Sequence, residues 1–268
     1  MNKSAIGVFD SGVGGLSCVK ELLRCLPGED IKYLGDTLRM PYGVRTKEDL
    51  CDCAKDNVAF LQRRGVKLIA AACGTVSSNV PKELLTNLEV PFVDVINPTV
   101  MAALKATKTK RIGIIATPAT IKSNCMGVRL KELDSGIEVI GVACPDFVPL
   151  IESGHIGDDI IRRCAEGYLA QVKEFGVDTL ILGCTHYPLI SKVIGEIMGS
   201  EVALIDSGRE TATGVKMTLE KLNLLNDRTE GGNAEFFVTN NAEAFDSVAK
   251  VFLGEETRIK SIFTNIED

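Results

Sequence analysis

The chain contains 268 residues, 45% of them hydrophobic, and carries a formal net charge of -6. This size supports one large domain or two smaller ones, and the negative charge argues against a nucleic-acid partner and fits a soluble protein. Because no apolar run approaches the roughly 20 residues that span a bilayer, and the N-terminus lacks the apolar region of a signal peptide, we expect no membrane association and a cytoplasmic location.

Short apolar runs alternate with longer amphipathic ones along the chain. The short runs predict strands at 5–9, 31–35, 66–72, 91–95, 111–116, 137–143, 179–183, 202–206 and 235–239. Amphipathic patterns predict helices, as at 46–65 and 158–176, and the second ends in the glycine that commonly follows a helix C-terminus. This alternation is typical of an α/β fold with parallel sheets flanked by helices.

The nine cysteines are expected to be reduced thiols, because their number is odd, the chain is long and no export signal is present. Cys51 and Cys53 lie two positions apart in a predicted helix, where their side chains face different ways, so we interpret them as ordinary helix residues. We expect structural roles for Cys18, Cys25, Cys125, Cys144 and Cys164, and a surface or capping role for His155.

Two stretches of the chain share a pattern. GVKLIAAAC (65–73) and GVDTLILGC (176–184) each begin with Gly-Val, continue as an apolar strand and end in cysteine. Each half also opens with an Ile-Gly strand, in AIGVFDSG (5–12) and RIGIIATP (111–118). We therefore predict two related α/β halves, each with one cysteine at the carboxyl end of a strand.

This position suits chemistry, because ligands of open parallel sheets bind beyond the carboxyl ends of the strands. Amides at the start of a following helix favour anions, including thiolates. Two facing halves would place Cys73 and Cys184 on opposite sides of one cleft, where one thiolate could remove a proton from carbon while the other thiol supplies one from the opposite face. Since a free thiol has a pKa of about 8.5, each needs a helper, and His186 and Asp10 are the candidates.

Four motifs resemble those of the glutamate racemases, in the same order and spacing: FDSGVGGLS (9–17), GDTLRMPYG (35–43), AACGTVSS (71–78) and LGCTHYPLI (182–190). The resemblance extends over almost the whole chain. It implies two α/β domains with the active site in the cleft between them. It also implies an isomerase that interconverts L- and D-glutamate without cofactor or metal and supplies D-glutamate for peptidoglycan, and hence for cell wall biogenesis and cell shape.

By this resemblance, Cys73 is the base that acts on D-glutamate and Cys184 the base that acts on L-glutamate, with Asp10 and His186 as their helpers. Glu152 matches an acidic residue near the site. The implied substrate-binding positions are Asp10, Ser11, Pro41, Tyr42, Gly43, Gly74, Thr75, Thr117, Thr120, Thr185 and His186. Gly74 departs from the family, which commonly has asparagine there, so we expect one substrate contact to be missing.

The resemblance also implies a discontinuous first domain, 1–97 plus 208–268, and a second domain at 98–207. It allows a homodimer without identifying an interface. Three alternatives stay open: a racemase for aspartate or a broader range of amino acids, an amino-acid-binding relative without turnover, and a racemase that uses pyridoxal phosphate. A thiol–disulfide oxidoreductase is disfavoured, because the sequence contains no C-x-x-C motif.

Overall fold

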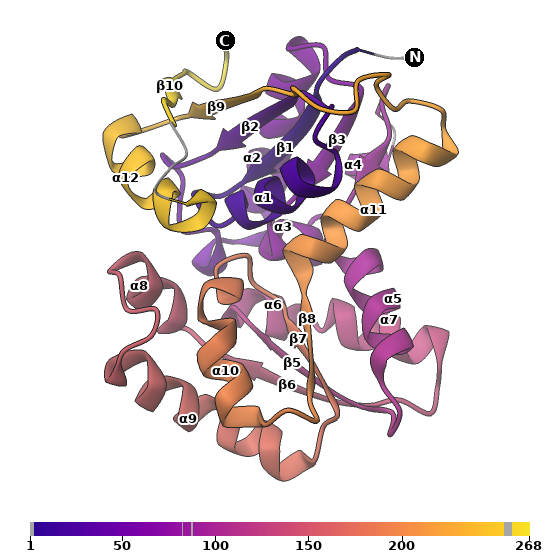
Figure 1. Cartoon of the computed structure of the whole chain (residues 1–268), viewed down its shortest axis with the longest axis vertical. Coiled ribbons are helices and arrows are strands. Elements are labelled where there is room, and N and C mark those ends of the chain that lie inside the picture. The colour runs from indigo at the N-terminus through magenta and orange to yellow at the C-terminus, as the bar shows by residue number, and fades with distance from the viewer. Residues whose placement is uncertain (1–2, 82, 87, 255–258) are drawn as a thin grey trace.

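The computed structural model describes residues 3–81, 83–86, 88–254 and 259–268. The structure contains two parallel sheets, the first in the upper half of the view in Figure 1 and the second in the lower half. Each sheet lies between layers of helices. The chain builds most of the first sheet, crosses to the second and then returns, so that both termini lie in the same half (Figure 1). The predicted α/β fold with two parallel sheets is confirmed.

The first sheet has six strands in the order β10-β9-β2-β1-β3-β4, all paired in parallel. They are β1 (Ile6–Asp10), β2 (Ile31–Gly35), β3 (Leu68–Ala71), β4 (Phe92–Val93), β9 (Ala234–Val238) and β10 (Ile262–Phe263). Successive side chains of a strand point to opposite faces. Val8 therefore packs into the core beneath one helix layer while Phe9 packs into the core beneath the other, which explains the unbroken apolar runs.

Helices cover both faces of the first sheet. One layer contains α1 (Leu16–Cys25), α11 (Ser207–Lys221) and α12 (Ala242–Leu253). The other contains α2 (Lys47–Arg63), α3 (Gly74–Asn79) and α4 (Glu83–Thr86). The short 3-10 helix η1 (Tyr42–Val44) precedes α2.

The second sheet has four parallel strands in the order β6-β5-β7-β8. They are β5 (Arg111–Ala116), β6 (Glu138–Ala143), β7 (Thr179–Leu182) and β8 (Ala203–Asp206). One face is covered by α8 (Phe147–Glu152), α9 (Asp159–Phe175), η2 (Tyr187–Ile190) and α10 (Ser191–Met198). The other is covered by α5 (Ile96–Ala106), α6 (Pro118–Ser123) and α7 (Cys125–Leu133).

Helices α5 and α11 join the two halves. Helix α5 follows β4 of the first sheet but packs on the second, and α11 follows β8 of the second sheet but packs on the first. The two helices also contact each other. The predicted division of the chain at 97/98 and 207/208 stays a prediction.

All nine predicted strands are confirmed, with ends that move by a few residues, as for 66–72 against Leu68–Ala71. Strand β10 was not predicted, because its two residues are exposed at the outer edge of the sheet and form no recognisable pattern. The predicted helices at 46–65 and 158–176 appear as α2 and α9, and Gly176 ends α9 in the left-handed conformation, with φ of 73°.

Each of the nine cysteines is a free thiol in the structure. Within the described ranges, no helix has both the length and the apolar character needed to cross a bilayer.

Candidate active site

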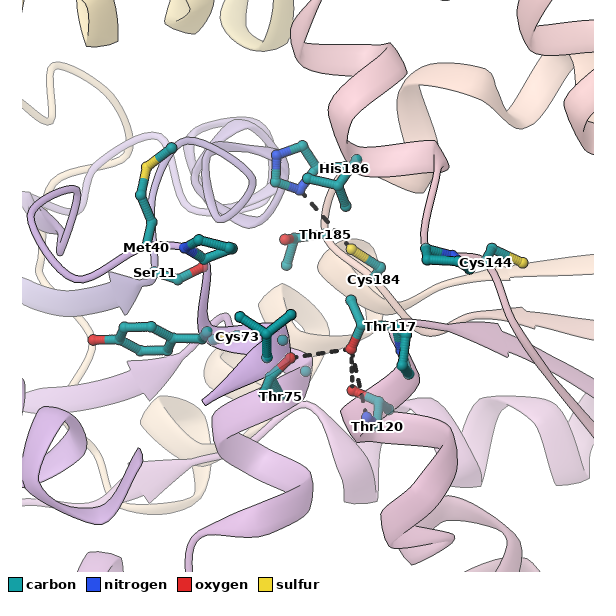
Figure 2. A pocket seen from close by; sticks show the side chains of 18 of the residues that line it. Ser11, Met40, Cys73, Thr75, Thr117, Thr120, Cys144, Cys184, Thr185 and His186 are labelled. Atoms are coloured by element: carbon teal, nitrogen blue, oxygen red, sulfur yellow. Dashed lines mark hydrogen bonds between the residues drawn. The ribbon is translucent and has the colours of Figure 1, made fainter. Parts of the chain in front are cut away.

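A cavity of about 340 Å³ lies between the two halves, at the carboxyl ends of strands from both sheets. Its walls are formed by residues that come after β1, β2 and β3 in the first half and after β5, β6 and β7 in the second. Its volume lies in the range of about 300–1,000 Å³ that is usual for small-molecule sites. Both Cys73 and Cys184 line this cavity, and Figure 2 labels them on ribbons that belong to different halves.

Every residue assigned to the site from the sequence lines this cavity. The first half contributes Asp10, Ser11, Pro41, Tyr42, Gly43, Cys73, Gly74 and Thr75. The second half contributes Thr117, Thr120, Glu152, Cys184, Thr185 and His186. The structure brings these residues together, while their individual roles in binding and catalysis stay predictions.

The cavity also has lining residues that sequence reasoning missed. They are Met40, Val44, Pro118, Cys144, Pro145, Val148, Pro149 and Gly183. Cys144 directly follows β6, so the rule for strand ends that identified Cys73 and Cys184 could have found it as well. Its thiol is fully buried, burial raises its pKa, and its Sγ donates to the carbonyl oxygen of Val142 at 3.7 Å. This environment agrees with the structural role expected for Cys144.

Cys73 lies two residues beyond β3, at the N-cap of α3, and its side chain is buried. Burial raises the pKa of the Cys73 thiol, and the negative charge of Asp10 raises it further. The backbone amides of Thr75 and Val76 act in the opposite direction without reversing the shift. The Cys73 thiol therefore keeps its proton near neutral pH.

Asp10 is the last residue of β1, the strand beside β3, and its side chain is buried. Its Oδ2 accepts hydrogen bonds from the backbone amides of Gly15 at 2.9 Å and Gly12 at 3.3 Å. Asp10 thus fixes the glycine-rich loop before α1 and also places a negative charge near Cys73.

Cys184, His186 and Glu152 form a connected group in the second half. The Sγ of Cys184 lies 3.9 Å from Nδ1 of His186, and Nε2 of His186 lies 2.9 Å from Oε1 of Glu152. Burial by itself would lower the pKa of His186, but the hydrogen bonds with Cys184 and Glu152 outweigh it and raise that pKa to about 10. The imidazole is therefore cationic near neutral pH, and it lies between the sulfur of Cys184 and the carboxyl group of Glu152.

The chain forms different local structures after Cys73 and after Cys184. Cys73 begins α3, as expected, whereas Cys184 leads into a turn and then into η2 rather than directly into an α-helix. Pro188 lies in the first turn of this 3-10 helix, where proline is well tolerated. The expected helix N-terminus beside both thiols is therefore present only for Cys73, and the cationic His186 occupies the corresponding region near Cys184.

Hydroxyl groups cross between the halves on one side of the cavity. The Oγ1 atoms of Thr75 and Thr117 are 3.2 Å apart, and those of Thr117 and Thr120 are 3.0 Å apart (Figure 2). Thr117 caps the N-terminus of α6 through the amide of Thr120. Neither lysine nor arginine occurs among the described residues that line the cavity, so an anionic ligand would rely on hydroxyls, amides and His186.

The loop from Met40 to Val44 forms a largely apolar wall of the cavity, and the bond between Met40 and Pro41 is cis. Tyr42 anchors this loop, because its hydroxyl donates to the buried carboxylate of Asp36 and accepts from Asn57. Burial and the charge of Asp36 raise the pKa of Tyr42. The hydroxyl of Tyr42 is thus occupied within the wall.

Gly74 faces the second half of the chain, where the backbone of Gly183 closes the space beside it. The main chain at Gly183 therefore occupies the space that a side chain at position 74 would enter, while the missing substrate contact stays a prediction. Within the described part of the chain, no group of three or more histidine, cysteine, aspartate or glutamate residues is arranged to hold a metal ion. Independence from cofactors stays a prediction.

Comparisons with known proteins agree on one family. The sequence pattern of the family described as Asp/Glu/Hydantoin racemase matches residues 6–218. A glutamate racemase of Geobacter metallireducens is 43% identical over 250 residues, which cover 93% of each chain. The crystal structure of a Bacillus anthracis glutamate racemase has a TM-score of 0.94 at 35% identity and covers 99% of this chain and 98% of its own.

This chain is also similar to a solved structure of an enzyme with its ligand bound. It is the glutamate racemase of Francisella tularensis with D-glutamate, and it has a TM-score of 0.91 and 34% sequence identity. The match covers 100% of this chain and 99% of that chain. The similarity therefore extends over both halves and the cavity between them.

Proposed function

This chain belongs to the Asp/Glu/Hydantoin racemase family, and we propose that, as a glutamate racemase, it interconverts L- and D-glutamate by proton transfer between two thiols and the α-carbon, without a cofactor. The observation that carries this mechanism is the placement of Cys73 and Cys184 in opposite halves at one cavity, each with its own ionisable neighbour. Inversion of a carbon centre needs an acid and a base on opposite faces, and two thiols from opposite halves are suited to that requirement.

In the direction from L- to D-glutamate, the thiolate of Cys184 removes the α-proton, and the electron pair of the C–H bond is delocalised into the α-carboxylate. Cys73 then donates its proton to the opposite face of the carbon, which yields D-glutamate and leaves Cys73 as the thiolate. The raised pKa of Cys73 keeps this thiol protonated until the carbanion forms, and the carbanion is the stronger base that takes the proton. In the reverse direction the two thiols exchange roles.

The two helpers differ in charge. As a cation, His186 can stabilise the negative charge that Cys184 carries as a base, and Glu152 keeps the imidazole oriented and protonated. As an anion, Asp10 instead favours the neutral form of Cys73 and can accept its proton before Cys73 acts as the base. The second half thus supports the thiolate, and the first half supports the thiol.

Glutamate carries two carboxylates and an ammonium group, and the polar part of the cavity offers partners for them. The hydroxyls of Ser11, Thr75, Thr117, Thr120 and Thr185, together with backbone amides, suit the carboxylates. Asp10 and Glu152 are the anions that an ammonium group can approach. Hydroxyls, amides and the cationic His186 would thus bind the carboxylates in a site whose described lining residues include no arginine or lysine.

We infer further that the enzyme acts in the cytoplasm and supplies D-glutamate for peptidoglycan, which would connect it with cell wall biogenesis and cell shape. A homodimer is compatible with this role, and sedimentation of the purified protein at several concentrations tests it. A single sedimenting species of monomer mass throughout the range would rule the dimer out.

The decisive experiment follows circular dichroism of L- or D-glutamate with protein that has been dialysed against a chelator. We expect the optical signal of either enantiomer to decay to zero without added pyridoxal phosphate or metal. Activity that returns only with pyridoxal phosphate would refute the two-thiol mechanism. Parallel reactions with L- and D-aspartate test the alternative specificity, and faster turnover of aspartate would displace glutamate as the substrate.

A further inference from the structure

The imidazole of His186 is in contact with the first half of the molecule as well as with its own. The ring of Phe252 lies 5.6 Å from the imidazole, centroid to centroid, at an interplanar angle of 83°. Phe252 belongs to α12, which packs in the core of the first half. A helix near the end of the chain therefore touches the predicted helper of Cys184.

A second element of the first half closes another side of the same ring. A Cβ atom added to Gly14 would lie 2.5 Å from Nδ1 and Cε1 of His186 and 2.3 Å from Oγ1 of Thr185. The main chain at Gly14 therefore approaches the imidazole more closely than any residue with a side chain would allow. The absence of a side chain at Gly14 leaves the room that His186 occupies.

The segment that carries His186 is anchored in both halves. Leu189, three residues further along, packs against the core of the first half and against the core of the second. His186 and Phe252 are both almost completely buried, so water has little access to their contact. The ring is thus bounded by Cys184 and Glu152 from its own half and by Gly14 and Phe252 from the other.

We propose that Phe252 is a positioning residue for the reaction: together with Gly14, it holds the imidazole of His186 in the orientation that serves Cys184. The inference rests on the proposed racemase function. Edge-to-face contacts between aromatic rings are directional, so Phe252 restricts rotation of the imidazole as well as its translation. The chemistry at Cys184 therefore depends on α12 of the opposite half.

The matched pair of variants is Phe252→Leu and Phe245→Leu. Both residues are buried phenylalanines of α12, but the ring of Phe245 packs against Tyr33 instead of His186. We expect Phe252→Leu to lower kcat at least about tenfold with a smaller change in KM, because misplacement of a reacting group by about 1 Å can cost 10²-fold. Phe245→Leu should change kcat less than about twofold if it acts on packing alone.

Deuterium isotope effects test positioning against general destabilisation. If the step at Cys184 is slowed, removal of deuterium from α-deuterated L-glutamate limits the rate more strongly, and the isotope effect on kcat/KM rises. With α-deuterated D-glutamate the deuterium leaves through Cys73, the later step at Cys184 limits the rate, and the isotope effect falls. Equal movement with both enantiomers, or wild-type kinetics in Phe252→Leu, would overturn the proposal.

Nuclear magnetic resonance provides a test that is independent of turnover, because the chain has only two histidines. In the wild type, the imidazole protons of His186 should show Overhauser contacts with the Phe252 ring, and their signals should move in Phe252→Leu but not in Phe245→Leu. If Phe252→Leu does not fold, Phe252→Met replaces it, since methionine fills a similar volume without a ring. Absence of the wild-type contact refutes the inference, whereas an inactive wild type with the contact present refutes the proposed function instead.

Discussion

Gly74 in the first half lies directly against the carbonyl oxygen of Gly183 in the second: a Cβ atom at Gly74 would approach that oxygen to 2.7 Å. Real Cβ atoms essentially never show so short a contact, and the obstacle is backbone rather than a flexible side chain. From the family motif we expected one substrate contact to be missing at Gly74, which an asparagine side chain would supply if there were room for it. The structure shows instead that the chain carrying Cys184 occupies this space.

A side chain at Gly74 should therefore separate the two halves. We expect Gly74→Ala and Gly74→Asn each to lower kcat/KM about tenfold or more, since both thiols must reach one carbon atom and a displacement of about 1 Å can cost 10²-fold. Steady-state kinetics in both directions measure the effect. Gly167→Ala is the matched control, because Gly167 is exposed in α9 with nothing within 4 Å of its added Cβ atom.

An opposite result at Gly74 would also be informative. If Gly74→Asn binds glutamate more tightly with the fold intact, the main chain at Gly183 must move to make room for the new side chain. The expectation from the family motif would then be correct after all.

Asp10 and Cys73 offer a prediction about ionisation. The carboxylate of Asp10 raises the pKa of the Cys73 thiol by its negative charge, so Asp10→Asn should lower that pKa. The amide oxygen of asparagine can still accept the hydrogen bonds from Gly12 and Gly15, so the loop should keep its shape. The rate of alkylation at Cys73, followed by mass spectrometry across a pH series, measures the change.

The control for this variant is Asp52→Asn, which removes the same charge from an exposed position on α2. It should leave the alkylation profile of Cys73 unchanged. A profile in Asp10→Asn that is unchanged or moved to higher pH would contradict the assigned direction. Racemisation should still fall in Asp10→Asn, because the group that accepts the proton of Cys73 is lost.

Much of the fold could be predicted because local patterns and burial agree in this chain. Strands with both faces buried give apolar runs such as LIAA in β3 and RIGIIA in β5, and the helices between them are amphipathic. The edge strand β10 escaped prediction because Ile262 and Phe263 gain their strand character only from pairing with β9. Such pairing is a property of the tertiary structure, and two residues carry no periodic signal.

The site was predictable to the extent that it depends on strand ends and motifs. Cys73 and Cys184 each lie two residues beyond a strand, so the rule for parallel sheets placed both at the cavity. Contacts between the halves could not be predicted, because they depend on how two sheets are set against each other. The approach of Phe252 to His186 joins residues with no shared motif, and no pattern in α12 indicates it.

The pH dependence of stability should reflect His186. A histidine in an unfolded chain titrates near about 6.5, and the folded structure raises the pKa of His186 to about 10. The protonated ring therefore contributes stability that is fully present below pH ~6.5 and is lost as the pH rises towards about 10. Thermal unfolding measured between these limits should show a falling melting temperature.

Glu152→Gln isolates this contribution, because it removes the carboxylate from Nε2 of His186 while keeping a similar shape. We expect a lower pKa for His186 in the variant and a weaker decline of the melting temperature above neutral pH. Nuclear magnetic resonance titration of the imidazole signals reports the pKa directly, and His155 serves as an internal reference. An unchanged pKa in Glu152→Gln would show that Cys184 alone maintains the cationic ring.

The assignment of each thiol to one face of the substrate makes the strongest prediction. Cys73→Ala and Cys184→Ala should each abolish racemisation, because inversion needs a proton donor opposite the base. Each variant still has one base, so Cys73→Ala should remove the α-proton only from the L-enantiomer and Cys184→Ala only from the D-enantiomer. A glutamate analogue with a leaving group on the β-carbon makes this visible, since elimination requires only the first proton removal.

Cys144→Ala provides the control for these two variants, because Cys144 is a third thiol in the cavity wall that we predict takes no part in proton transfer. It should eliminate from both enantiomers and still racemise glutamate. Two outcomes would refute the two-base assignment: elimination from the same enantiomer by both Cys73→Ala and Cys184→Ala, or racemisation near the wild-type rate by either one. The two thiols line one cavity from different halves, which motivates the expectation of one base for each face, and the enantiomer given to each thiol follows from the resemblance to the family.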